Sequence, residues 1–152
     1  MSTELDAKIT DAEWEIMRVV WTQKKVTSKE IIDILHDKKN WKPATTKTFI
    51  GRLVKKGMLH TEADGKRYFY SAIANEEETI QSMVDGFFDH ICSKAVGKTI
   101  ADMISSATLS FDDVALLEEA LENKKKEAVD EVKCNCVPGQ CQCKTHHCKK
   151  HH

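Results

Sequence analysis

Apolar residues recur every three or four positions in three stretches near the start of the chain. This period places them on one face of a helix, so we expect helices over about residues 11–22, 28–37 and 43–56. Thr10 and Thr27 each stand three residues before a glutamate, the arrangement of a capping box at a helix start. Pro43 is well tolerated in a first helical turn, and Gly57 marks the end of the third helix.

Two short β-like stretches follow at residues 58–62 and 67–72, with Asp64-Gly65 between them as a hairpin turn signal. Three helices followed by a hairpin is the element order of a winged helix-turn-helix. The expected fold is therefore α+β, mainly α with a small β-hairpin: an N-terminal winged helix-turn-helix, then an all-helical region, then a short tail.

Residues 76–132 carry only helical patterns, with expected helices to about residue 93, over 96–107 and after Ser110. Cys92 closes the first apolar face and is interpreted as a small buried apolar residue. The last face includes Leu121, with Val129 as a candidate final member. Three short amphipathic helices make a thin core, so their wide apolar faces suit burial in a homodimer. Packing against the chain's own N-terminal part is the alternative.

The formal net charge of −1 hides an uneven distribution. Residues 1–73 carry 14 Lys and Arg against 10 Asp and Glu, whereas residues 74–132 carry 5 against 14. Residues 133–152 carry 4 Lys and no acid. We therefore expect three parts: a basic winged-helix domain at 1–73, a helical dimerisation region at 74–132 and a Cys/His-rich tail at 133–152.

No apolar run approaches the ~18 residues of a membrane span, and the N-terminus lacks the basic and apolar regions of a signal peptide. We expect a cytoplasmic protein without a membrane partner, whose cysteines stay reduced. An enzyme is not expected, because the sequence has no phosphate loop, no G-x-S-x-G and no H-E-x-x-H motif.

Hydroxyls and long cations gather on the side of the third predicted helix that is opposite its apolar stripe. Threonines can contact phosphate or a thymine methyl, and Arg or Lys can reach guanine edges, so this stripe suits the major groove of DNA. Two cations at the hairpin tip suit a wing that grips phosphates, and Lys38 and Lys39 extend the basic patch. An ordinary solvated surface is the alternative, which the winged-helix order disfavours. The predicted DNA-binding residues are Lys42, Thr45, Thr46, Lys47, Thr48, Arg52, Lys55, Lys66 and Arg67.

The tail contains the motif C-x-C-x4-C-x-C, with Pro138-Gly139 as a turn at its centre. The turn lets the two arms fold back so that four thiolates face one point, which suits tetrahedral Zn²⁺ or Cu⁺ in low-coordinate thiolate sites. A redox pair or an adventitious metal sink is the alternative. The predicted metal ligands are Cys134, Cys136, Cys141 and Cys143. Candidate auxiliary ligands follow at the terminus, with an expression remnant or a weak metal scavenger as the alternatives: His146, His147, Cys148, His151 and His152.

The stretches D-A-E-W-E-I-M-R-V-V-W (11–21) and T-T-K-T-F-I-G-R-L-V-K-K-G-M-L (45–59) resemble the penicillinase-repressor (BlaI/MecI) family. The four-cysteine motif resembles the copper-responsive, CopY-type branch of that family in Gram-positive bacteria. The terminal extension K-T-H-H-C-K-K-H-H (144–152) departs from the family pattern and leaves open whether four ligands complete the site.

The resemblance implies a homodimer that binds a two-fold operator before copper-export genes. It also implies that the Zn(II) form binds DNA and that Cu(I) displaces zinc and releases the operator. A copper chaperone that delivers Cu(I) is a further candidate partner. Two alternatives stay open: a copper-buffering or metal-delivery protein, and a repressor that responds to other thiophilic metals such as Ag(I) or Cd(II).

Overall fold

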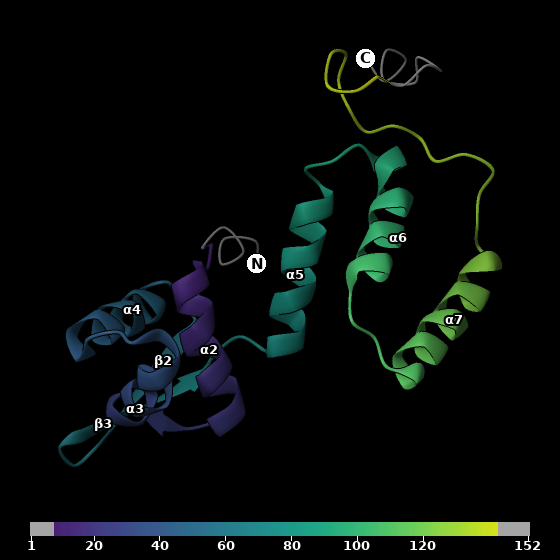
Figure 1. Cartoon of the computed structure of the whole chain (residues 1–152). Helices are drawn as coiled ribbons and strands as arrows, with labels where there is room; N and C mark the ends of the chain where they lie inside the picture. The colour runs from purple at the N-terminus through teal and green to yellow at the C-terminus, as the bar shows by residue number, and fades with distance from the viewer. Residues whose placement is uncertain (1–7, 143–152) are drawn as a thin grey trace. The chain divides into compact units, whose positions relative to one another are not determined.

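The computed structural model describes residues 8–142 of the 152-residue chain and forms two compact units that divide between Met83 and Val84. The division falls inside helix α5 (Glu76–Phe88). Figure 1 shows the helices and strands in chain order. The domain boundaries expected at residues 73/74 and 132/133 stay predictions.

Residues 8–83 contain three complete helices and a three-stranded antiparallel sheet in the order β1-β3-β2. Three helices followed by the β2–β3 hairpin confirm the expected winged helix-turn-helix and the mainly α fold class. The elements are α2 (Asp11–Gln23), β1 (Val26–Thr27), α3 (Ser28–Lys39), α4 (Pro43–Lys55), β2 (Leu59–Asp64) and β3 (Arg67–Ala72).

Local sequence signals define the ends of these elements. Thr10 and Thr27 accept hydrogen bonds from Glu13 and Glu30 backbone N–H groups, and each glutamate side chain accepts one back, so both capping boxes are confirmed. Gly57 follows α4 with φ of +82°, a conformation that costs glycine little. Strand β1 was not predicted, because two residues are too few to show a period.

The core of this unit lies where α2, α3 and α4 pack on one another and on the sheet. Trp21 is one of its buried residues, and its indole N–H donates to the Ala74 carbonyl at 2.9 Å, which ties α2 to the chain after the hairpin. The largest fully buried apolar side chains are Ile16, Met17, Val20, Val26, Ile31, Ile50 and Leu53.

Beyond α5 the second unit contains a short 3-10 helix, η1 (Ser93–Ala95), then α6 (Val96–Ser106) and α7 (Phe111–Lys125). Ser110 caps α7 in a capping box with Asp113, as its sequence suggests. Helix α5 ends at Phe88, earlier than predicted, and Val129 lies beyond the end of α7. None of the helices between residues 8 and 142 is long and apolar enough to cross a membrane.

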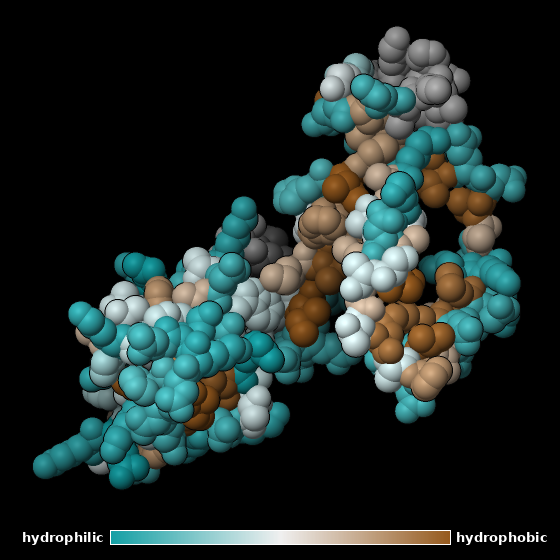
Figure 2. Space-filling view, viewed as in Figure 1, coloured by the Kyte–Doolittle hydropathy of each residue, from teal (hydrophilic) through white to brown (hydrophobic). Residues whose placement is uncertain are grey.

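Helices α5, α6 and α7 bury none of their side chains within the described part of the chain. Most of their large apolar residues are instead solvent-exposed, from 37 % for Ile104 to 96 % for Phe111, and the others are half-buried. Figure 2 shows this surface as brown side chains over the helices. Residues 8–142 therefore leave a wide apolar surface uncovered on these helices.

Candidate functional site

Four cysteine side chains meet in the second unit: Cys92, Cys134, Cys136 and Cys141, whose sulfur atoms all lie within 4.8 Å of one another. The Sγ atoms of Cys92 and Cys134 are 3.6 Å apart, and those of Cys134 and Cys141 are 3.4 Å apart. These separations are well beyond a disulfide bond of about 2.05 Å. Cys134 and Cys136 are buried, whereas Cys92 and Cys141 are half-buried. The cluster is therefore a compact set of thiols.

The segment after α7 returns to the short corner between α5 and η1, and polar contacts hold it there. The Ser93 N–H donates to Asn135 Oδ1 at 2.7 Å, and the Ser93 hydroxyl donates to the Lys133 carbonyl. Lys94 and Glu131 form an ion pair at 2.8 Å. These contacts fix the Cys134 end of the tail beside Cys92.

A turn brings the second arm of the motif back to the first. The Gln140 N–H donates to the Val137 carbonyl at 3.0 Å, and the Val137 N–H donates to Gln140 Oε1 at 2.9 Å. Gly139 has φ of +97°, a region that glycine enters without strain. The turn expected at Pro138-Gly139 is thus present, and it delivers Cys141 to the cluster.

The donor set fits a soft tetrahedral cation. Four thiolates at about 2.3 Å from Zn²⁺ would have sulfur atoms about 3.8 Å apart, close to the separations seen here. Burial and hydrogen bonds with Cys134, Cys92 and Cys141 raise the pKa of the Cys136 thiol to about 12. Four neighbouring thiolates repel one another, so a cation is needed to hold them all ionised. The Cys136 N–H also donates to Cys134 Sγ at 3.3 Å, which favours negative charge on that sulfur.

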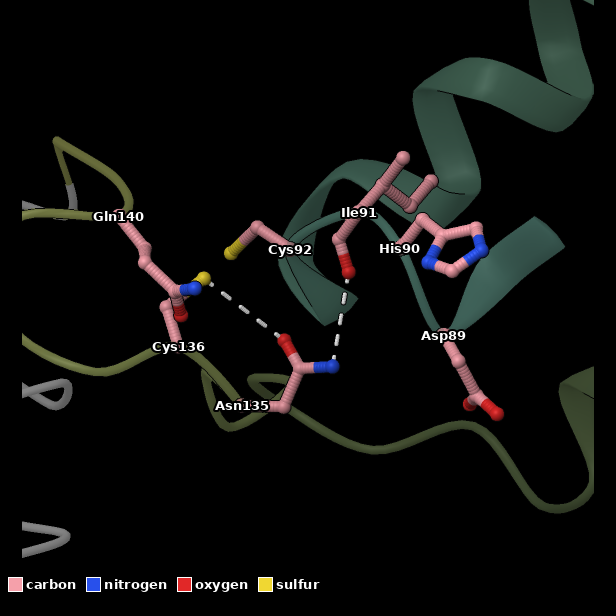
Figure 3. A pocket seen from close by; sticks show the side chains of 7 residues that line it. All are labelled: Asp89, His90, Ile91, Cys92, Asn135, Cys136 and Gln140. Carbon is pink, nitrogen blue, oxygen red and sulfur yellow. Dashed lines mark hydrogen bonds between the residues drawn. The ribbon is translucent and has the colours of Figure 1, made fainter. Parts of the chain in front are cut away.

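Cys92 and Cys136 also border a solvent-accessible pocket of about 290 Å³, and their sulfur atoms lie near one another at its edge (Figure 3). Its remaining lining is Asp89, His90, Ile91, Asn135 and Gln140. The Asn135 side-chain amide donates to the Ile91 carbonyl at 3.5 Å across one wall. A metal ion in the cluster would therefore be reachable from solvent through this pocket.

The structure brings together three of the four predicted ligands, Cys134, Cys136 and Cys141. Cys143 and the candidate auxiliary ligands His146, His147, Cys148, His151 and His152 lie outside the described residues. The interpretation of Cys92 as a buried apolar residue was wrong, because α5 ends at Phe88 and Cys92 belongs to the corner that receives the tail. The available signal was a cysteine just before a second helix start, but nothing local in the sequence linked it to a motif 42 residues away.

A second candidate surface lies on α4 and on the hairpin of β2 and β3. Most of the predicted DNA-binding side chains are solvent-exposed there, and Thr45 is half-buried. The hairpin turn has Gly65 at φ of +68° followed by Lys66, which holds two cations at the exposed tip. The exposed members are Lys42, Lys47, Thr48, Arg52, Lys55, Lys66 and Arg67.

Two residues that were expected on the DNA-binding surface or in the basic patch beside it are placed differently. Thr46 is only 1 % exposed, because it lies on the inner face of α4 with Ile50 and Leu53, so its side chain does not reach the outer surface. Lys38 forms an ion pair with Glu15 at 2.8 Å, which offsets its charge. The outer surface of α4 and the hairpin tip therefore carry the basic character.

The chain is similar in sequence to a known protein family. The family described as penicillinase repressor matches residues 9–123 of the chain. A protein of Latilactobacillus sakei, described as an uncharacterised 16.5 kDa protein in the ptsI 3′ region, is 42 % identical over 136 residues, covering 90 % of this chain and 93 % of the relative.

The methicillin resistance regulatory protein MecI of Staphylococcus aureus is 29 % identical over 118 residues, covering 78 % of this chain and 95 % of MecI. Among solved structures, the monomeric form of Bacillus licheniformis BlaI with the blaP half-operator is 34 % identical, covers 47 % of this chain and 87 % of the BlaI chain, and has a TM-score of 0.43. The family match ends before the three clustered tail cysteines but includes Cys92. The chain belongs to the penicillinase repressor family of transcriptional repressors, with the BlaI and MecI proteins.

Proposed function

We propose that the chain is a metal-responsive transcriptional repressor whose Zn(II)-loaded homodimer binds the operator of copper-homeostasis genes. Cu(I) releases the repressor by displacing zinc from the C-x-C-x4-C-x-C site. The single observation that carries the metal response is the cluster of thiols attached to a repressor of this family. Soft thiolates suit both metals, and they favour Cu⁺ in low coordination.

The DNA contacts are proposed for α4 and the hairpin tip. Arg52, Lys55 and Thr48 lie on the exposed side of α4, which would enter the major groove. Lys66 and Arg67 at the tip would contact phosphates. The repressor acts where the operator lies, which places it in the cytoplasm.

The homodimer is supported by the uncovered apolar residues of α5, α6 and α7. Apolar area that stays in water in one chain is removed from it when two copies pack together, at about 25 cal/mol per Å². Large exposed patches of this kind are rare in monomers. A dimer also presents two α4 helices, as a two-fold operator requires.

Release by Cu⁺ requires the copper-bound form to prefer the DNA-free state. By reciprocity, operator DNA then weakens Cu⁺ binding by the same factor. A coupling free energy of about 1.4–3 kcal/mol gives roughly ten- to a hundred-fold release. Zn²⁺ takes four thiolates, whereas Cu⁺ prefers lower coordination. This difference would give the zinc-bound and copper-bound forms different tail conformations.

The test is operator binding by the zinc-loaded protein under Cu⁺ titration, with zinc release followed in parallel. Replacing Cys134 and Cys136 together with Ser should leave operator binding largely insensitive to Cu⁺. Val137→Ser changes the same arm without removing a thiol and should respond as the parent does. Release of the double variant at the parental copper dose would show that the tail is not the sensor.

Two other functions give different results in the same experiment. A copper-buffering protein would bind metal but show no sequence-selective, salt-dependent binding to a palindromic duplex. Four sulfur donors can bind Cu⁺, Ag⁺ and Cd²⁺, so the donor set alone does not identify the inducer. A repressor for another thiophilic metal would be released by Ag⁺ or Cd²⁺ at lower doses than by Cu⁺.

A further inference from the structure

We propose that Cys92 is a ligand of the zinc-loaded metal centre, so that the metal fastens the cysteine tail to the corner between α5 and α6. This inference rests on the proposed function and adds a ligand from outside the tail motif. It also supplies a physical link from the metal to the helices with uncovered apolar faces.

The sulfur geometry is the first support. Cys92 Sγ is 3.6 Å from Cys134 Sγ and within 4.8 Å of the other two sulfurs, so these four side chains alone form a complete set of tetrahedral thiolate donors. Cys136 lies at the edge of the same pocket as Cys92 (Figure 3). The helical region therefore supplies one of four donors.

The docking contacts are the second support, and they do not involve sulfur. Ser93 receives the tail through Asn135 and the Lys133 carbonyl, and Lys94 pairs with Glu131. Supporting polar contacts of this kind orient the residues that bind the metal in metal sites. They hold the corner and the tail in a fixed register, in which Cys92 lies opposite Cys134.

The position of Cys92 gives its ligation a consequence. Cys92 is the N-cap of η1, and the Ala95 N–H donates to the Cys92 carbonyl at 2.8 Å, immediately before α6 begins at Val96. A movement of Cys92 would therefore also move the first residues of α6. Because the tail motif has four cysteines of its own, Cu⁺ can be held by the tail alone, so exchange of Zn²⁺ for Cu⁺ would free Cys92 and loosen the corner.

Alkylation of the full chain tests the ligand directly. The zinc-loaded and copper-loaded proteins are treated with N-ethylmaleimide, and the modified cysteines are identified by mass spectrometry. We expect zinc to protect Cys92 together with Cys134, Cys136 and Cys141, and copper to protect Cys92 less than the tail cysteines. Alkylation of Cys92 in the zinc protein as fast as in the metal-free protein would overturn the inference.

Variants separate ligation from packing. Cys92→Ser and Cys92→Ala should each weaken zinc binding at least about ten-fold in competition with a chelator, since loss of a supporting residue alone costs that much in metal sites. With Co²⁺ in place of zinc, both should lose intensity in the thiolate charge-transfer band. Ser93→Ala removes a docking hydrogen bond but no thiol, and it should keep that band.

The two proposals fail in different ways. If Cys92→Ser keeps parental zinc affinity, cobalt spectrum and copper response while the Cys134/Cys136 double variant loses the response, the function stands and the Cys92 inference is wrong. If zinc protects Cys92 but no cysteine variant alters operator release, Cys92 is a ligand and the sensing function is wrong. The alkylation result decides the matter for the parent chain even if a Cys92 variant does not fold.

Discussion

At the scale of single residues, the ion pair between buried Glu13 and half-buried Lys56 shows how one charge is kept inside the winged helix. Glu13 is fully buried, and Lys56 Nζ lies 2.5 Å from its Oε1 atom. Burial alone would raise the Glu13 pKa, but hydrogen bonds from Lys56 and Thr10 outweigh it and hold the pKa below its ordinary 4.5. The pair therefore stabilises the fold fully above pH 4.5, and this stabilisation is lost as the pH falls through the lower pKa of the folded state.

Replacing Lys56 by Met should lower the free energy of unfolding by about 3 kcal/mol at pH 7, because a buried carboxylate then lacks its partner. The loss should shrink toward pH 4, where Glu13 of the variant is protonated. Urea unfolding at the two pH values measures both effects. Lys25→Met, which breaks an exposed pair with Glu62, should cost under about 1 kcal/mol at either pH. An equal loss at both pH values would contradict this account.

Residue identity in the sites was only partly predictable. The tail cysteines were predictable as metal ligands because four of them fall within ten residues around a turn. Cys92 and Thr46 do not, since their roles depend on where α5 ends and on which side of α4 faces the core. Helical periodicity defines a face only to within a residue or so, and it contains no information on a contact made 42 residues later.

At the scale of elements, the helix starts were predictable because capping boxes are local chemistry, and the hairpin was predictable because Asp64-Gly65 is a turn signal. The two-residue strand β1 and the contact of the tail with the α5–η1 corner were not, because each depends on a partner distant in sequence. The cations at the hairpin tip are expected to contact DNA phosphates, which a substitution can test.

Lys66→Ala should weaken binding to operator and to unrelated duplex by similar factors, because a phosphate contact carries no base information. The slope of log K against log salt concentration should fall by about one, as expected when one phosphate contact is lost. Fluorescence anisotropy across a salt series measures both quantities. Lys38→Ala serves as the matched control, since its charge is already paired with Glu15, and it should leave the slope unchanged. A loss confined to the operator would instead make Lys66 a base-reading residue.

At the scale of the whole molecule, the exposed apolar residues of α5, α6 and α7 would be stabilised by burial against a partner. We expect this partner to be a second copy of the chain. Ile100 on α6 is 41 % exposed, and Met103 and Ile104 continue its face at helical spacing. Ile100→Glu should therefore convert the dimer to a monomer in sedimentation equilibrium, since a charge would be buried at the interface.

The monomer should keep the winged helix, whose core lies in residues 8–83, but lose operator affinity by about a hundred-fold or more, because two half-sites are no longer held by one particle. Lys98→Glu introduces the same charge on the opposite side of α6 and should remain dimeric and bind as the parent does. If the parent chain itself sediments as a monomer at operator-binding concentrations, these faces pack against the chain's own N-terminal part, and a metal-induced shift at Cys92 would have to reach α4 within one subunit.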